Sequence, residues 1–305
     1  MYRLRVIERN LLPLVLITTA VGLAAPGAGQ ALSGAITPLL ALLMLCVALS
    51  FDLAALRAVL RRPGVQALAT GLVYGPMSVA GFALARLIFG QSTLGLGVTL
   101  VGVLPTDVSS PLLVWIARGN VALATVLNAV NTALAPLLVP LLFLSLTGVE
   151  LDVPVVALIA ELALTVLVPT VVGVALRTRF PRRVDPFEPA LSAGSSLSYL
   201  LLLLAVVGPN AEAILGAPVQ MLLVGAAALA LNGLGYAFAL LAWPLLAARE
   251  DRVAMLFTVS KKEFSIAAFV VVTSGLPAEV ALPAVVYAVV QMITSPLVAG
   301  VVRRR

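Results

Sequence analysis

The sequence predicts an all-α polytopic membrane protein. Of its 305 residues, 62% are apolar and 10% are charged, and the mean hydropathy is +1.15. A soluble domain averages about 45–50% apolar and about 25% charged residues, so this chain has too few polar side chains to cover a water-facing surface. Its apolar runs reach roughly the 20 residues that a membrane-spanning helix needs, whereas a β-barrel would show alternating strands of about ten residues.

Charged clusters and Pro/Gly turns divide the chain into ten expected spans. Their limits are 10–26, 31–51, 63–90, 93–117, 121–148, 153–176, 186–208, 218–247, 250–275 and 278–302. The first is interpreted as a span and not as a cleavable signal peptide, because Pro26 follows Ala25 and the next apolar run begins within a few residues.

The basic residues predict the orientation. Sixteen of the 19 Lys and Arg residues fall at the two ends and in alternate loops, which the positive-inside rule assigns to the cytoplasm. They are Arg3, Arg5, Arg9, Arg57, Arg61, Arg62, Arg118, Arg177, Arg179, Arg182, Arg183, Arg249, Arg252, Arg303, Arg304 and Arg305. The opposite loops carry acids such as Glu150, and Arg86 is the one base near that side. We expect both termini to be cytoplasmic, in the inner or plasma membrane.

Composition also limits the function. The positive loops account for the net charge of +6, so a bilayer and not a nucleic acid is the expected partner. The chain has no His and a single Cys, Cys46, inside an apolar run, which excludes a His general base, a His/Cys metal site and a disulfide framework. We expect no enzymatic activity, no metal site and no cofactor other than a coupling ion, sodium or a proton.

The chain divides near Val153 into two sets of five spans. Because five is odd, the second set enters the membrane from the opposite side, which predicts inverted repeats over 1–152 and 153–305. Segments 122–137 and 281–297, in the fifth and tenth spans, share several residues at similar spacing, which supports this division weakly.

Polar residues interrupt the fourth and ninth spans at corresponding depths. In the fourth span, Pro105 and Pro111 each remove a backbone donor, which breaks the helix. Four charged residues fall in the two interruptions, namely Asp107, Lys261, Lys262 and Glu263. Each costs at least ~2.5–3.5 kcal/mol at the bilayer centre, so a function is favoured over an inert ion cluster. Interrupted helices at matching positions of inverted halves indicate the binding site of a secondary transporter.

At these residues the chain resembles the bile acid:sodium symporters. The segment from Pro105 to Pro136, with Ala117-Arg118-Gly119-Asn120 at its centre, is the most specific match. Further similar segments are Leu49-Ser50-Phe51-Asp52-Leu53, Arg61-Arg62-Pro63, Asn232-Gly233-Leu234-Gly235-Tyr236 and Ser265-Ile266-Ala267-Ala268. The resemblance implies ten helices in an inverted repeat, interleaved panel and core domains, and crossing broken helices that bind the ligand.

The family's sodium ligands carry over in part. Its fourth-span Ser-Asn pair corresponds to Ser110 and Pro111, and its fifth-span Ser and Thr correspond to Ala124 and Asn128. Its ninth-span Glu and Gln correspond to Val259 and Glu263, and its third-span Gln to Gly71. Ser110, Asn128 and Glu263 are the positions that retain a side-chain oxygen, so the resemblance does not imply the usual two-site sodium scheme.

The leading hypothesis is a secondary active transporter of a small organic anion, with alternating access at the crossing. Half-helix N-termini and nearby hydroxyls suit anions. The substrate candidates are Thr106, Ser109, Ser110, Asn131, Asn232, Ser260 and Ser265, and the ion or coupling candidates are Asp107, Asn128, Lys261, Lys262 and Glu263. We expect Lys261 or Lys262, paired with Asp107 or Glu263, to take the place of sodium, leaving proton coupling or passive exchange.

Three alternatives remain open. Val114-Trp115, the Ala-Arg-Gly turn and Asn131 also resemble arsenite efflux permeases, but Thr106 stands where that family has the Cys that would bind arsenic. A non-transporting membrane sensor or scaffold is a second alternative. The third is an intramembrane enzyme that uses Asp107 and the two lysines as acid and base, for which the sequence shows no nucleophile.

Overall fold

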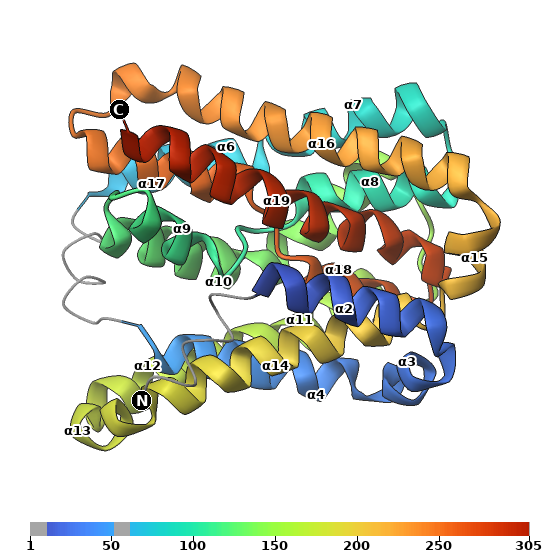
Figure 1. Ribbon diagram of the computed structural model, residues 1–305, viewed down its shortest axis with the longest axis horizontal. Helices are drawn as coiled ribbons and strands as arrows, with labels where there is room; N and C mark the ends of the chain where they lie inside the picture. Colours follow the sequence, from blue (N-terminus) through green and yellow to red (C-terminus); the bar gives the residue numbers. More distant parts are fainter. Residues whose placement is uncertain (1–10, 52–61, 305) are drawn as a thin grey trace.

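The computed structural model describes residues 11–51 and 62–304, and every regular element in these ranges is a helix (Figure 1). The all-α class predicted from hydropathy is therefore confirmed for the described chain. Residue 10 and the basic residues Arg3, Arg5, Arg9, Arg57, Arg61 and Arg305 lie outside the described ranges.

The helices of the first half end with the long α10. They are α2 (Leu11–Ala24), α3 (Pro26–Leu32), η1 (Ser33–Ala35), α4 (Ile36–Leu49), α6 (Pro63–Tyr74), α7 (Pro76–Phe89), α8 (Thr93–Val103), α9 (Ser110–Ile116) and α10 (Val121–Thr147). The second half begins with α11 (Val155–Leu162), the π-helical turn η2 (Ala163–Leu167), α12 (Val168–Arg179), α13 (Pro181–Val184), η3 (Asp185–Phe187), α14 (Glu188–Val207) and α15 (Ala211–Gly216). It continues with α16 (Pro218–Leu241), η4 (Trp243–Leu245), α17 (Arg249–Ser260), α18 (Phe264–Thr273), η5 (Ala278–Ala281) and α19 (Leu282–Arg304).

Within the described ranges, 7 helices are long and apolar enough to cross a membrane. The other three expected spans are shorter: α2 has 14 residues, the fourth span is split into α8 and α9, and the ninth into α17 and α18. Large apolar side chains such as Leu87 and Val156 are exposed on the outside. This surface suits lipid, and the chain is an integral membrane protein.

Two expected boundaries are wrong. The spans placed at 31–51 and 186–208 begin earlier, at Pro26 and Pro181. Both prolines lie in the first turn of a helix. The N–H groups of this turn make no intrahelical hydrogen bond, so proline removes none there, and its fixed φ suits the helix. The expected limits make Pro26 the last residue of the first span and leave Pro181 in the loop before the seventh, whereas each begins a helix.

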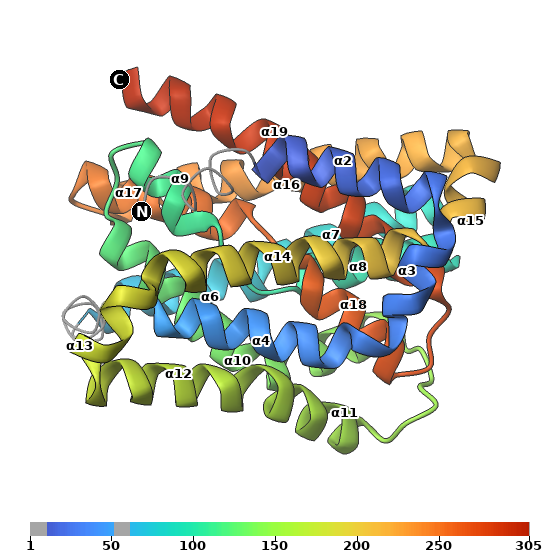
Figure 2. The same cartoon turned by 60° about the horizontal axis from the view of Figure 1, so that its bottom comes forward.

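The helices pack as two groups, which touch through α18, α10 and α19. In one group α14 lies against α2 and α4, and α4 lies against α12 (Figure 2). In the other, α16 packs on α7, α17 and α19, and α10 packs on α9 and α17. The breaks between α8 and α9 and between α17 and α18 lie inside this second group, while α18 also contacts α4 and α14. The second interrupted helix thus reaches, through α18, the contact between the two groups.

Candidate functional site

The two interruptions cross as extended segments. Leu104, at the end of α8, and Lys261, at the end of α17, both have extended backbone angles. Glu263 N donates to Pro105 O at 3.0 Å, and Asp107 N donates to Lys261 O at 3.4 Å. These two bonds pair the segments in an antiparallel sense. The backbone groups at each break have no intrahelical partner, and the other break supplies one.

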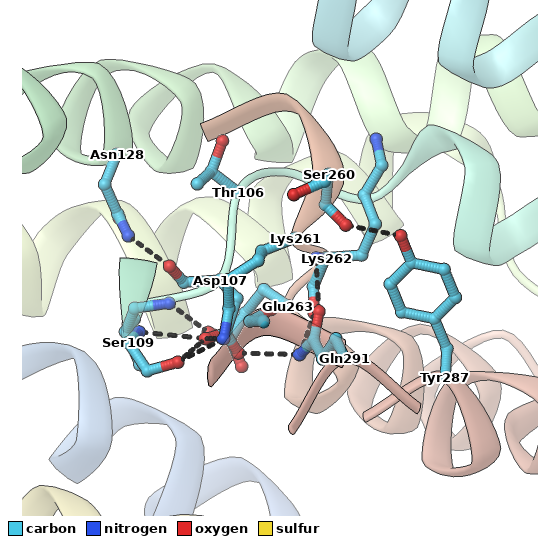
Figure 3. Close-up of polar contacts among 12 residues, drawn as sticks. Thr106, Asp107, Ser109, Asn128, Ser260, Lys261, Lys262, Glu263, Tyr287 and Gln291 are labelled. Carbon is cyan, nitrogen blue, oxygen red and sulfur yellow. Dashed lines mark hydrogen bonds and ion pairs between the residues drawn. The ribbon is translucent and has the colours of Figure 1, made fainter. Parts of the chain in front are cut away.

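A buried ion pair lies at this crossing. Lys261 Nζ is 3.2 Å from Asp107 Oδ1, and both side chains have no exposed surface (Figure 3). The ammonium also donates to Ser109 Oγ at 2.6 Å. Ser109 contacts the same carboxylate oxygen through its hydroxyl and through its N–H, the latter at 2.9 Å. Gln291 Nε2 donates to the other oxygen, Asp107 Oδ2, at 3.2 Å. Lys261 therefore uses two of its three donors.

Lys262 points into a different environment. Its ammonium donates to three backbone carbonyls, Val73 O at 3.0 Å, Gly102 O at 2.9 Å and Leu104 O at 2.8 Å. These carbonyls lie at the ends of α6 and α8, where the last four C=O groups of a helix lack intrahelical partners and carry a partial negative charge. No carboxylate of the described residues lies within ion-pair distance of Lys262. The two neighbouring lysines thus occupy separate sites.

Glu263 bridges the two breaks. Its Oε2 accepts from Val108 N at 3.0 Å, and its Oε1 accepts from Ser265 N at 3.4 Å and from Ser265 Oγ at 2.5 Å. With Asp107 bonded to Ser109 N, both half-helix N-termini already hold a carboxylate of the chain itself. The N–H groups expected to be free for a substrate anion are therefore occupied in this structure.

The expected asparagines support the backbone of the crossing. Asn128 Nδ2 donates to Asp107 O at 2.7 Å, and Asn232 Nδ2 donates to Ser260 O at 2.8 Å. Asn131 Nδ2 donates to Thr106 Oγ1 at 3.0 Å, and Thr106 Oγ1 donates to Thr258 O at 2.8 Å. All twelve sequence-predicted residues are close to the crossing. The side-chain amides of Asn128, Asn131 and Asn232 donate to protein atoms, so these donors are already in use.

Three hydroxyls at the crossing are buried without a hydrogen-bond partner. They belong to Ser110, Thr258 and Ser260, each with no exposed surface. A buried polar group without a partner costs roughly 1–3 kcal/mol. Ser110 begins α9, and Thr258 and Ser260 lie in the last turn of α17, so these hydroxyls flank the two breaks.

Sequence reasoning missed the contribution of α19. Gln291 accepts from Lys262 N at 2.9 Å and donates to Asp107, and the Tyr287 hydroxyl donates to Ser260 O at 2.6 Å. Tyr287 and Gln291 are four residues apart on an apolar helix and share one face, a spacing that the sequence displays. Tyr199 of α14 was also missed; its ring packs edge-on against Phe264, with centroids 4.6 Å apart, where the two helix groups meet.

Interrupted helices that meet inside an apolar bundle are typical of membrane transporters. The chain belongs to the sodium bile acid symporter family, whose sequence profile matches residues 37–217. The family predicted from residue resemblance is thereby confirmed, and the chain is a membrane transporter by family.

Relatives agree with this assignment. The chain is 31% identical to the uncharacterized protein YbaS of Bacillus subtilis (strain 168), over 82% of each chain. It is 27% identical to the uncharacterized sodium-dependent transporter YocS of the same organism, over 76% of this chain and 71% of the relative. It is also 29% identical to the probable sodium/metabolite cotransporter BASS1 of Arabidopsis thaliana, over 60% of this chain and 46% of that protein.

Proposed function

We propose that this protein is a secondary active transporter of small organic anions, which bind where the two interrupted helices cross. The observation that carries the proposal is the set of unpartnered buried hydroxyls, Ser110, Thr258 and Ser260. A carboxylate arriving there would accept from these hydroxyls and from the third, unused donor of Lys261. It would compete with Asp107 for the ammonium, so that binding loosens a contact between the two breaks.

Alternating access is the second part of the proposal. The crossing belongs to one helix group, while α14 of the other group faces it through the contact of Tyr199 with Phe264. A relative movement of the two groups would expose the crossing to one side and then to the other. All four charged side chains of the crossing are buried in this structure, and we assign it to a step between the two open states.

The ten-span inverted repeat, over 1–152 and 153–305, also remains a proposal. Seven long helices, α2 and two interrupted helices provide ten segments, and each half contains one interruption. The alternation of basic and acidic loops agrees with this count.

The predicted topology is tested with reporters. Alkaline phosphatase or green fluorescent protein fused after Arg305 is expected to report a cytoplasmic end, and the same reporters inserted at Glu150 an external loop. An insertion at Arg182, in a basic loop, serves as the cytoplasmic control. A cytoplasmic signal at Glu150 would contradict the ten-span topology.

The substrate site is tested with the double variant Ser110→Ala, Ser260→Ala. The assay is uptake of labelled acetate, benzoate, succinate and cholate into proteoliposomes, which first identifies the transported anion. The affinity of that anion is expected to fall about tenfold, since each hydroxyl contributes roughly 0.5–1.5 kcal/mol. The melting temperature should not fall, because neither hydroxyl bonds to the protein. Ser145→Ala, an exposed serine of α10, is the matched control. Unchanged affinity in the double variant would place the substrate elsewhere.

A further inference from the structure

We propose a second anion-binding site, separate from the crossing, in the cavity beside Arg86. This cavity has a volume of about 340 Å³, within the range of roughly 300–1,000 Å³ typical of small-ligand pockets. It lies where the turn after α7 and the start of α8 meet the end of α10. We expect its ligand to be a small carboxylate with an apolar body. That this ligand is also the transported anion rests on the proposed function.

The charge of the cavity favours an anion. Arg86 is the single base near the side opposite the sixteen basic loop and terminal residues. Its guanidinium lies 5.3 Å from the centre of the Phe82 ring, a cation–π contact that restrains its position. It forms no ion pair with the described residues, and no Asp or Glu lines the cavity. A guanidinium binds a carboxylate through two parallel hydrogen bonds.

The remaining walls suit the rest of such a ligand. Phe82, Leu96 and Val149 supply apolar surface, and Gln91 adds an amide. The turns on either side depend on Gly90 and Gly148, whose φ values of 62° and 65° favour glycine. A Cβ on either residue would meet no atom within 4 Å, which leaves open space beside the backbone.

No described residue that lines this cavity belongs to the crossing. Further along the same two helices, α7 lies directly on α8, where a Cβ on Gly81 would be 2.7 Å from Gly102 Cα. Gly102 O also holds the Lys262 ammonium. The cavity and the crossing therefore use different parts of α8, with Gly95, Leu96 and Thr99 at the cavity and Gly102 beside the Lys262 ammonium.

The test measures protection of a cysteine in the cavity. Val149→Cys is placed in a Cys46→Ala background, and the protein is held in phosphatidylcholine nanodiscs and labelled with a charged maleimide. Benzoate is expected to slow labelling at least fivefold, and uncharged benzamide is expected to have no effect. Arg86→Gln should abolish the protection, and Arg86→Lys, which keeps the charge but loses the fork, should weaken it. A Gln91→Cys reporter repeats the measurement, and melting temperatures verify folding.

Two results would overturn the proposal. One is that benzoate does not slow the labelling, or that it slows the labelling equally with Arg86 and with Arg86→Gln. The other is protection by phosphatidylglycerol without benzoate, lost in Arg86→Gln, which would assign the cavity to a lipid headgroup. The readout is labelling and not uptake, so benzoate can protect the cysteine even if the protein transports no organic anion. A failure of the proposed transport function is therefore distinguishable from a failure of the proposed site beside Arg86.

Discussion

Uptake of the transported anion is expected to be equal in sodium and in choline, an ion too large for a small cation site. Lys261 and Lys262 place two ammonium groups at the crossing, and three carbonyls surround the second. Such oxygens are the ligands that hard cations prefer. A cation fixed to the chain at this place leaves no need for a free one. Proteoliposomes with and without a sodium gradient, and with a pH gradient, measure the coupling directly.

The variant Lys262→Ala is expected to acquire a response to sodium. Removal of the ammonium leaves the carbonyls of Val73, Gly102 and Leu104 without their partner and opens space between them. Sodium at 100 times its Kd would then stabilise the variant by about 2.7 kcal/mol, seen as a higher melting temperature in sodium than in choline.

Matched variants and the wild type decide this prediction. Lys262→Arg keeps a charge in the site, and Lys262→Met fills it with an apolar side chain, so neither should respond to sodium. Uptake by the wild-type protein that requires a sodium gradient would contradict the assignment of the lysines as fixed cations.

The second large effect is expected from Asp107→Asn. The substitution leaves Lys261 as a charge without a counterion inside the bundle, and breaking a buried pair in this way costs about 3–5 kcal/mol. We expect a lower melting temperature and loss of anion uptake, because the Asn side chain keeps a similar shape but cannot neutralise the ammonium.

Two comparisons isolate the charge. Adding Lys261→Met to Asp107→Asn removes the orphaned ammonium and should restore most of the stability without restoring uptake. Asp185→Asn breaks the pair of Arg177 with Asp185, which is 2.6 Å long but has a 55% exposed aspartate, and should cost at most about 1 kcal/mol. Equal losses for Asp107→Asn and Asp185→Asn would show that the crossing pair is not energetically special.

Hydropathy predicted the helices better than it predicted their ends. Long apolar runs such as Val121–Thr147 were placed within a residue, because burial in lipid depends on local composition. The starts at Pro26 and Pro181 were misplaced, because a proline both ends one segment and begins the next. The break in the ninth span contains no proline; there Gln291 accepts from Lys262 N and Pro105 O accepts from Glu263 N, replacing helical hydrogen bonds with tertiary ones.

The sequence by itself determined that the chain is a membrane protein, that its fourth and ninth spans are interrupted, and that four charges meet at that depth. These properties follow from local composition, from prolines and from the cost of charge in lipid. The tertiary structure decided that Lys261 pairs with Asp107, that Lys262 binds carbonyls of α6 and α8, and that Glu263 caps α18. Such partners depend on the rotation and separation of helices that are distant in the chain. Adjacent residues on one segment also point in different directions. Pairing is therefore a property of the packed bundle and not of any local sequence pattern.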